Sequence, residues 1–393
     1  MNLAFKDILH NKLRFIMTSF GLGLLLTVVM AMSGIYAGLV FEAGVLVDTL
    51  NADLWVVQKD TFGPFADATK ISEIYGSVLG SIKGVREYNM VSFQTLQAAI
   101  GANKKRLTVV GLKKEPQGFS KRIISGNYIK GSHYEIVADI SLGLKLGEFI
   151  RIGYDDFKVV GLTNGVVNSS GEAVVFMALQ DAQKIQFQKN NEAVRNDKAQ
   201  LKSSLNVNES SRSDRAKLEK IYNNRIVNAI ILSTEKGWKE SVLNSIKRWN
   251  YFGVFTTEEE IDILTKNVIE KPKKQLGLFK MILLIAATAI VMLIIYTLTQ
   301  DKTKDIATLK LIGTPVYMIV GLILNQAIAM GLIGYVTAFT IIYNTHYLFP
   351  RRVKILSEDM VSLFLIVLAM CVIASLLGIK KALNTDINQA LGG

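Results

Sequence analysis

The sequence predicts an α-helical membrane protein with four transmembrane helices, one before and three after an extracytoplasmic α+β domain. The first observation is that four long stretches carry no charged residue: Phe15–Phe41, Met281–Gln300, Val316–Phe349 and Met360–Ile379. Each can cross ~30 Å of hydrocarbon, which takes ~20 helical residues. The second is that the chain between the first two stretches is polar and alternates strand-like with helix-like patterns. A mean hydropathy of +0.30 suits a chain divided between bilayer and water.

The composition excludes several classes of function. The chain has 393 residues, more than one ordinary domain, and a net charge of +12 that is compatible with nucleic-acid binding. We discount that reading because the basic residues flank the apolar stretches or are scattered, with no zinc finger, basic helix or RNA-binding aromatic pattern. Cys371 is the only cysteine and lies inside an apolar stretch, which excludes a disulfide framework and a metal–thiolate cluster.

The first apolar stretch could be a cleaved signal peptide or a retained signal anchor. It runs for 27 residues, which is longer than the apolar region of a typical signal peptide. Tyr36, Val40 and Phe41 fill its end, where a signal peptide would carry small residues of the Ala-x-Ala type. We therefore expect a retained transmembrane helix.

Basic residues predict the side of the membrane that each segment faces. Cytoplasmic loops carry an excess of lysine and arginine, and three segments that four spans place on one side are basic. They contain Lys6, Lys12 and Arg14, then Lys302, Lys304 and Lys310, and finally Lys380 and Lys381. The loop with Arg351, Arg352 and Lys354 opposes this assignment, but it is one segment against three. We expect both termini in the cytoplasm and the α+β domain outside it.

The residues before the first span have an amphipathic pattern. Phe5, Leu9, Leu13 and Ile16 share one helical face, which predicts a helix over 1–14 that lies on the inner leaflet. The alternative is a positively charged flank that only directs insertion.

The α+β domain divides into two similar halves. Each half has the pattern strand, helix, strand, over 54–93 and over 226–255. The simplest assembly is a split ferredoxin-like domain of two βαβ halves with a β-rich insertion at about 96–178. The expected strands are Leu54–Val57, Val85–Phe93, Leu107–Leu112, Phe149–Ile152, Phe157–Leu162, Ile226–Leu232 and Tyr251–Phe255, and the expected helices are Ser72–Ile82 and Glu235–Trp249.

Two further segments of this domain carry separate signals. Residues 181–222 are dense in polar side chains and cannot bury much area, so we expect a mobile loop or a polar helical hairpin. Thr257 and Glu260 have the spacing of a capping box, which predicts the start of a helix that leads to the second span. Pro272 is expected to interrupt or kink that helix.

No catalytic or metal-binding constellation emerges from the sequence. His10, His133 and His346 fall in three different compartments of the predicted topology, whereas a metal site or a catalytic triad needs its members close together. The chain has no Gly-Lys dipeptide and therefore no P-loop for ATP. Gly21 and Gly23 form a G-x-G inside a span, where we interpret it as permitting close helix packing.

A few polar and sulfur-bearing residues lie inside the spans. Asn325, Gln326 and Asn344 could join helices or line a path. Met30 and Met32 could contact a soft ligand such as haem. We favour helix packing for both groups.

The segment between the second and third spans, residues 301–314, is the most informative part of the sequence. In its helical pattern Ile306, Leu309 and the pair Leu311-Ile312 can share a face. A short helix on the cytoplasmic surface, rigidly joined to two spans, suits the transmission of force from a soluble partner. The alternative is a plain connecting loop.

The end of this segment carries a stop signal and a start signal. Gly313 is suited to end the short helix. Thr314 is a suitable N-cap and Pro315 a suitable first helical residue for the third span.

Four passages carry a resemblance to a known family. They are Leu3–Arg14, Leu144–Leu162, Thr303–Gly313 and Lys380–Leu391. In order and spacing they resemble the permease subunits of MacB/FtsX/LolC-type ABC transporters (type VII, including a DevC-like branch). Thr303–Gly313 is similar to the family's "REIG-x-LRA-x-G" segment, with Asp305 in place of the usual Glu and Lys310-Leu311 in place of the usual Arg-Ala.

The resemblance implies a permease subunit of a bacterial ABC transporter in the cytoplasmic (inner) membrane. Such a subunit is not an enzyme and binds no cofactor or metal itself, because ATP and Mg²⁺ belong to a separate cytoplasmic ATPase dimer. A second copy of the chain and membrane lipids are implied partners, and family members also use a periplasmic adaptor and an outer-membrane channel. Nucleic acid is not a partner.

The resemblance further implies mechanotransmission, in which the ATPase drives export or extraction of amphipathic or hydrophobic substrates. We expect Lys304, Asp305, Leu309 and Lys310 to contact the ATPase, Asp305 and Lys310 through polar contacts and Leu309 by filling a groove. The alternative is an FtsX-like signalling scaffold that regulates an extracytoplasmic partner such as a cell-wall hydrolase.

The expected organisation is an interfacial helix over 1–14, spans over 15–41, 280–300, 315–349 and 360–379, the α+β domain over 42–272, a coupling segment over 301–314, an outer loop over 350–359 and a cytoplasmic tail over 380–393.

Overall fold

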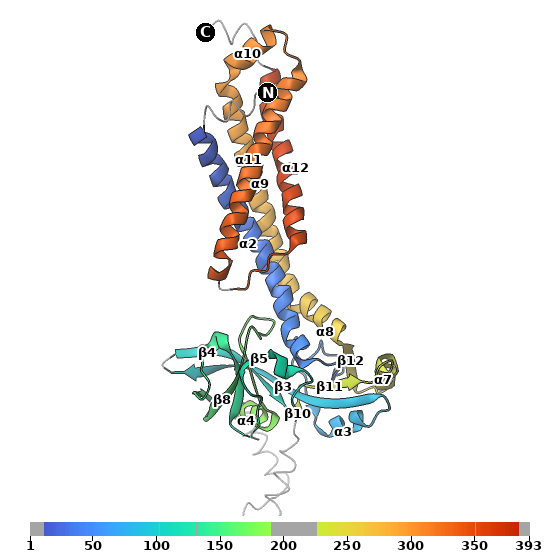
Figure 1. Cartoon of the computed structure of the whole chain (residues 1–393). Coiled ribbons are helices and arrows are strands. Elements are labelled where there is room, and N and C mark those ends of the chain that lie inside the picture. The colour runs from blue at the N-terminus through green and yellow to red at the C-terminus, as the bar shows by residue number, and fades with distance from the viewer. Residues whose placement is uncertain (1–11, 102, 131–132, 190–225, 350, 385–393) are drawn as a thin grey trace, which may run out of the picture. The chain divides into compact units, whose positions relative to one another are not determined.

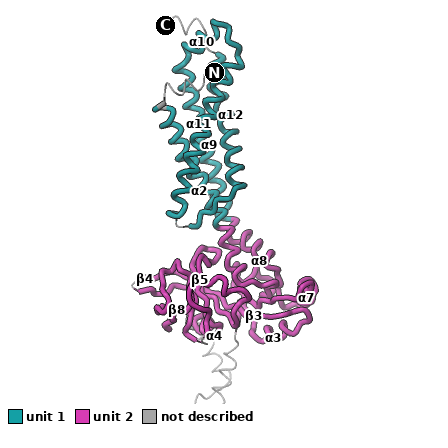
Figure 2. Tube along the Cα trace, in the orientation of Figure 1, with its two compact units in different colours: residues 1–38, 271–393 teal, residues 39–270 magenta. Residues whose placement is uncertain are grey.

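The chain forms two compact units (Figure 2). The computed structural model describes residues 12–101, 103–130, 133–189, 226–349 and 351–384. The membrane unit comprises residues 1–38 and 271–393, and the α+β unit comprises residues 39–270. Four helices are long and apolar enough to cross a membrane: Phe15–Leu50, Thr257–Asp301, Val316–Leu348 and Ser357–Leu383. The predicted fold class, one span before and three spans after an α+β domain, is confirmed.

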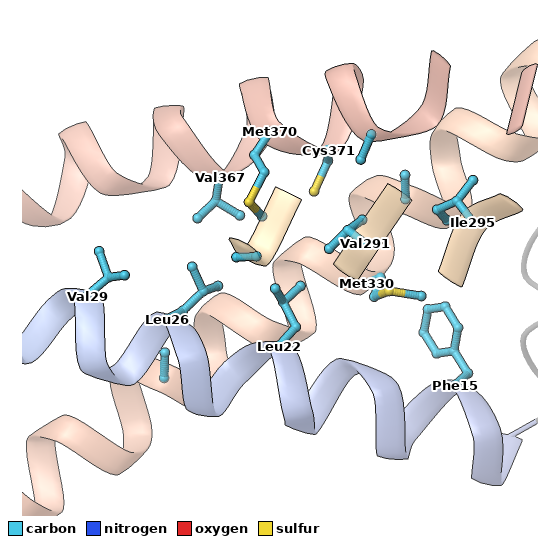
Figure 3. Close-up of a cluster of buried hydrophobic side chains, with 14 of the residues drawn as sticks. Phe15, Leu22, Leu26, Val29, Val291, Ile295, Met330, Val367, Met370 and Cys371 are labelled. Carbon is cyan, nitrogen blue, oxygen red and sulfur yellow. The ribbon is translucent and has the colours of Figure 1, made fainter. Parts of the chain in front are cut away.

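Four long helices lie side by side in the membrane unit (Figure 1). They are α2 (Lys12–Leu50), α9 (Glu270–Asp301), α11 (Val316–Thr345, followed by the 3₁₀ turn His346–Leu348) and α12 (Ser357–Leu383). A short helix, α10 (Thr303–Leu311), joins α9 to α11. Figure 3 shows Leu22 and Leu26 of α2 pointing into a core shared with Val291 of α9, Met330 of α11 and Val367 of α12.

Glycines set the spacing between these helices. A Cβ at Gly23 of α2 would lie 2.8 Å from the Thr337 side chain of α11, and a Cβ at Gly378 of α12 would lie 2.7 Å from Ile295 of α9. Small residues let helix backbones approach closely in lipid, where burial of apolar surface gives no driving force. A Cβ at Gly21 would meet nothing within 4 Å, so our interpretation of the G-x-G pair holds for Gly23 alone.

The segment 351–356 crosses α2 at two further glycines, Gly34 and Gly38. The Lys354 amide donates a hydrogen bond to the Gly34 carbonyl at 3.0 Å. A Cβ at Gly38 would overlap the carbonyl oxygen of Arg352. Since residues four apart lie on one helix face, both glycines are needed where the segment crosses.

The start of the chain is only partly described. The predicted interfacial helix over 1–14 falls outside the described residues up to position 11. From Lys12 onward the chain already belongs to α2, so the described part of this segment is continuous with the first span.

The sheet of the α+β unit begins with two interleaved βαβ halves. Its strand order is β12-β1-β11-β3, with each neighbouring pair antiparallel. This arrangement makes β1 parallel to β3 and β11 parallel to β12, which is the split ferredoxin-like arrangement that the sequence predicted. The first half is β1 (Leu54–Gln58), α3 (Ile74–Gly80) and β3 (Val85–Ile100), and the second is β11 (Ala229–Thr234), α7 (Lys239–Lys247) and β12 (Phe252–Thr256).

The insertion extends the same sheet. From β3 the order continues β4-β9-β6-β8-β5, and β7 pairs with β3 and β8. The long β3, which runs seven residues beyond its predicted end, joins the two parts because it pairs with β11 along its first half and with β4 along its second. The insertion strands are β4 (Asn103–Leu112), β5 (Ile123–Gly126), β6 (Glu135–Asp139), β7 (Phe149–Ile152), β8 (Asp155–Thr163) and β9 (Val174–Ala178).

The predicted strand 226–232 is in fact two strands. β10 (Ile226–Val227) pairs with β2 (Ile71–Ser72), and β11 starts at Ala229. Between them Asn228 is buried, accepting a hydrogen bond from the Phe93 amide at 2.7 Å and donating one to the Thr69 carbonyl at 3.0 Å. These side-chain bonds join the break to β3 and to the segment that precedes β2. The helix α4 (Leu179–Lys189) follows β9, and most of the polar segment 181–222 lies outside the described residues.

The capping box at the start of α8 (Thr257–Leu264) lies one residue earlier than predicted. Thr256 accepts from the Glu259 amide at 3.2 Å, and the Glu259 carboxylate accepts from the Thr256 amide at 2.8 Å. The prediction of Thr257 and Glu260 was wrong by one position, because both residues of each pair offer the required groups. Glu260 is consequently turned into the protein.

Pro272 does not interrupt the helix that follows. The turns of α8, a π-helical turn (Thr265–Ile269) and α9 form one continuous helix over Thr257–Asp301. Pro272 has no N–H to donate to the carbonyl four residues earlier, and the wider π turn covers that position.

Glu260 is a fully buried carboxyl group in the α+β unit, outside the part of the helix that crosses the membrane. Neither carboxylate oxygen has a hydrogen-bond partner in the part of the chain that the structure describes. The carboxylate lies against Gly63, where a Cβ would overlap it. Burial without a partner disfavours the charged form and raises the pKa of Glu260 to about 8.

We predict that Gly38→Ala destabilises the membrane unit by about 1–3 kcal/mol, because the added Cβ overlaps the Arg352 carbonyl. Gly21→Ala is the matched control on the same helix, and it should stabilise slightly because alanine is the better helix former. Thermal unfolding of the full chain in detergent measures both. Equal shifts for the two variants would contradict the crossing at Gly38.

We predict that Glu260→Gln stabilises the protein increasingly as pH rises. The raised pKa means that the folded state keeps its proton between about pH 4.5 and 8 while the unfolded state loses it. Wild-type stability therefore falls across this window by roughly 1.4 kcal/mol per pH unit, and the glutamine variant escapes that loss. Unfolding temperatures at pH 5 and pH 8 test this, with Asp262→Asn as an exposed control on the same helix. A constant difference between Glu260→Gln and wild type at both pH values would refute it.

Candidate functional site

The coupling segment folds into α10 with defined ends. The short helix begins after Lys302 and stops at Gly313, whose φ of +82° suits glycine. The Gly313 and Thr314 amides return to the Lys310 and Leu309 carbonyls at 3.1 and 3.0 Å, which satisfies two carbonyls at the helix end.

The start of α11 differs from the prediction by one residue. Pro315 is the N-cap, with an extended ψ of 143°, and Val316 is the first helical residue. Thr314 instead takes part in closing the end of α10 through its backbone.

Contacts on three sides fix α10 to the membrane unit. Ile306 and Ala307 are buried, and Ile306 belongs to the hydrophobic core of the four long helices. Lys310 Nζ donates to the Leu383 carbonyl at 2.8 Å, at the C-terminal end of α12, where carbonyls lack intrahelical partners. Because α10 is also joined covalently to α9 and α11, a displacement of α10 has to move these helices.

The other face of α10 is open. Lys304 and Asp305 are exposed, whereas Leu309 and Lys310 are half-buried. Leu311 and Ile312 are 59% and 76% exposed, so they do not share the buried face of Ile306 as the sequence suggested. At about 100° per residue, positions five and six after Ile306 lie about 140° and 240° around the helix from it.

Leu311 and Ile312 are the exposed residues of this segment that the sequence reasoning did not include among the expected contacts. They form an exposed apolar pair beside exposed charges, at the end of a membrane bundle. The sequence did contain a signal for their exposure, because two large aliphatic residues stand directly before the helix-ending Gly313 in a segment that is otherwise mostly polar.

A cavity of about 360 Å³ lies between α9, α10 and α11. Of the predicted contact residues, Asp305 and Leu309 line it, and Lys304 and Lys310 do not. Burial lowers the pKa of Lys302, and the nearby Asp305 carboxylate partly opposes that effect. The lining consists of Leu298, Thr299, Lys302, Asp305, Ile306, Thr308, Leu309, Leu322, Ile323 and Gln326.

The α+β unit has a more polar groove of about 420 Å³. It lies beside the loop after β4 and the start of α4. Both signs of charge line it, from Lys113, Lys114, Glu73 and Glu115, together with the half-buried Tyr128.

The two described histidines, His133 and His346, lie in different units. His133 Nδ1 lies 2.9 Å from Asp181, whose carboxylate also accepts from the Tyr134 amide at 2.8 Å. His346 contacts the carbonyl of Tyr343 at 2.8 Å, within its own helical turn. His10 lies outside the described residues. Within the described ranges, no three His, Cys, Asp or Glu side chains could hold a metal ion.

Met30 is buried in the core of the membrane unit, as expected for helix packing. Asn344 is exposed and donates to the carbonyl of Thr340, one turn earlier, at 2.7 Å. Gln326 is buried but lines the cavity instead of bonding to another helix.

Comparison with known proteins gives matches along the whole chain. Residues 277–387 match the family described as FtsX-like permease C-terminal. An uncharacterized ABC transporter permease of Mycobacterium tuberculosis is 21% identical over 399 residues, covering 99% of each chain. A putative hemin transport system permease protein HrtB of Staphylococcus epidermidis is 27% identical over 410 residues, covering 100% of this chain and 99% of that one.

Two solved extracellular regions are weakly similar. The periplasmic region of MacB from Actinobacillus actinomycetemcomitans has a TM-score of 0.36 at 10% identity, over 56% of this chain and 93% of that one. The extracellular domain of the transporter YknZ from Gram-positive bacteria has a TM-score of 0.34 at 10% identity, over 52% of this chain and 100% of that one.

The family match covers α9 to α12, the helices that surround the coupling segment, and the full-length relatives extend the similarity to both units. The C-terminal region of the chain is therefore FtsX-like, and over its whole length the chain is similar to ABC transporter permeases.

Proposed function

We propose that the chain transmits ATP-driven motion from a separate cytoplasmic ATPase, through α10, to an extracytoplasmic α+β unit. The observation that carries the proposal is α10 itself, with one face fixed in the membrane core and an exposed apolar pair on the other. Burying Leu311 and Ile312 in a partner groove would supply roughly 1.5–3 kcal/mol each. The exposed Lys304 and Asp305 beside them would orient the partner by charge.

The remaining predictions about partners and location belong to this proposal. Two copies would pair in the bacterial inner membrane with both termini cytoplasmic, each copy docking one ATPase subunit that binds ATP and Mg²⁺. In the most apolar part of the span that contains α9, only 17% of the residues are buried, whereas the corresponding share is 33–44% in the other three spans. This exposed apolar surface supports placing the second copy beside α9.

The substrates would be amphipathic or hydrophobic molecules, handled at the outer side of the membrane. Some of the full-length relatives are named as putative hemin transport permeases, and hemin belongs to this chemical class. It is therefore the first compound to test.

The second candidate function is an FtsX-like scaffold that regulates an extracytoplasmic protein. The groove of the α+β unit favours it, because a lining of lysines, glutamates and a tyrosine suits a polar protein surface better than an apolar cargo. A periplasmic adaptor would use such a surface as well.

We predict that Ile312→Lys lowers co-purification of the co-expressed ATPase at least tenfold, equivalent to about 1.4 kcal/mol, because a lysine in an apolar groove must be desolvated. Asp305→Lys should also weaken it by reversing a charge. Leu348→Lys is the control, since Leu348 is 68% exposed and follows the other end of α11. If all three variants retained the ATPase like wild type, α10 would not be the docking site.

We predict that hemin increases the ATPase rate of the reconstituted permease–ATPase complex severalfold. The rise should disappear in Asp305→Lys, where coupling is broken, while the ATPase alone should not respond. Phosphate release from proteoliposomes measures this. If neither hemin nor other amphipathic compounds changed the rate, and an added extracytoplasmic protein did, the regulatory function would replace the export function.

A further inference from the structure

The side chain of Gln326 lines the cavity between α9, α10 and α11. Gln326 is 7% exposed, and its side chain makes no hydrogen bond within the described part of the chain. Its amide faces the cavity and can donate a hydrogen bond to a ligand there that offers an acceptor.

The walls of the cavity are apolar. Leu298 comes from the last turns of α9, and Leu322 and Ile323 come from α11. Gln326 lies ten residues after the start of α11, which is about 15 Å along the helix. An occupant therefore needs an apolar body that reaches into the bilayer, with a polar acceptor part of the way along it.

The mouth of the cavity carries one charge of each sign. Lys302 is half-buried there, and Asp305 lies at the next turn of α10. A purely anionic headgroup would gain from Lys302 but would be repelled by Asp305. A headgroup with a phosphate and a primary ammonium can bind both through charge-assisted hydrogen bonds.

We propose that the cavity binds one phospholipid of the phosphatidylethanolamine type. Its phosphate would bind Lys302, its ammonium would bind Asp305, an ester carbonyl would accept from Gln326, and an acyl chain would lie against Leu298, Leu322 and Ile323. Such a lipid would fill the space under α10 and hold the helix against the bundle. The site goes beyond the coupling function and does not depend on the ATPase.

The competing occupants have different chemistry. An anionic lipid would need only Lys302 and would gain when Asp305 is neutralised. A side chain of the ATPase would fill the cavity only in the complex, so the permease alone would retain no lipid there. Both alternatives become outcomes of the same measurement.

The test is native mass spectrometry of the permease alone, in detergent, titrated with phosphatidylethanolamine, phosphatidylglycerol or phosphatidylcholine. We expect one tightly bound phosphatidylethanolamine per chain, with at least tenfold weaker binding of phosphatidylcholine, whose quaternary ammonium has no N–H donor. Lys302→Gln should weaken binding about tenfold. Asp305→Asn should reverse the preference in favour of phosphatidylglycerol.

Gln326→Leu tests the inner end of the cavity. It preserves side-chain volume, so the fold should be retained, which an unfolding temperature at or above that of wild type verifies. Binding of phosphatidylethanolamine should fall severalfold because the ester carbonyl loses its donor.

Lys304→Gln and Asn325→Leu are the matched controls for binding, since both residues are exposed and neither lines the cavity. Unchanged lipid binding in both supports the site. The proposal is overturned if the wild type retains no lipid, if phosphatidylglycerol binds better than phosphatidylethanolamine, or if the controls lose binding as much as the cavity variants.

Discussion

The architecture depends on the absence of water in the hydrocarbon core. Every backbone N–H and C=O group at that depth must be paired within the protein, so each crossing segment has to be a helix. Helices in lipid then need another reason to associate, because lipid tails are as apolar as their side chains. Here that reason is close packing: Gly23, Gly331 and Gly378 let neighbouring helices approach until side chains meet the opposing backbone. The four helices therefore pack as one bundle, and α10 packs against its end.

The packing of α10 against the bundle determines how its motion affects the other helices. A surface helix attached only by flexible loops could move without displacing the long helices. α10 instead buries Ile306 and Ala307 in the bundle and bonds to the end of α12 through Lys310. Its connections to α9 and α11 are only a few residues long, since α9 ends at Asp301 and α11 begins at Val316. A push on α10 is consequently a push on three of the four long helices.

The features that the sequence predicted best are those with long periodic signals. The charge-free stretches and the two βαβ halves were confirmed because dozens of residues contribute to each pattern. Features decided by one residue were less predictable. Thr256 and Thr257 are both followed three residues later by a glutamate, so the sequence could not choose between two capping boxes. Asn228 breaks a strand through hydrogen bonds to Thr69 and Phe93, which lie more than 130 residues away in the chain.

In the candidate site, too, the features set by local sequence were predictable and those set by packing between helices were not. The existence of a short helix between the second and third spans followed from local signals, whereas the residues on its open face depended on how α10 rests on the bundle. The sequence interpretation grouped Leu311 and Ile312 with Ile306, but at about 100° per residue they lie about 140° and 240° around the helix from it. The cavity was beyond sequence reasoning altogether, because its lining combines three helices. The position of Gln326 acquires meaning only when the space in front of its side chain is known, and under our two proposals that space lets a lipid and an ATPase act on the same helix, α10.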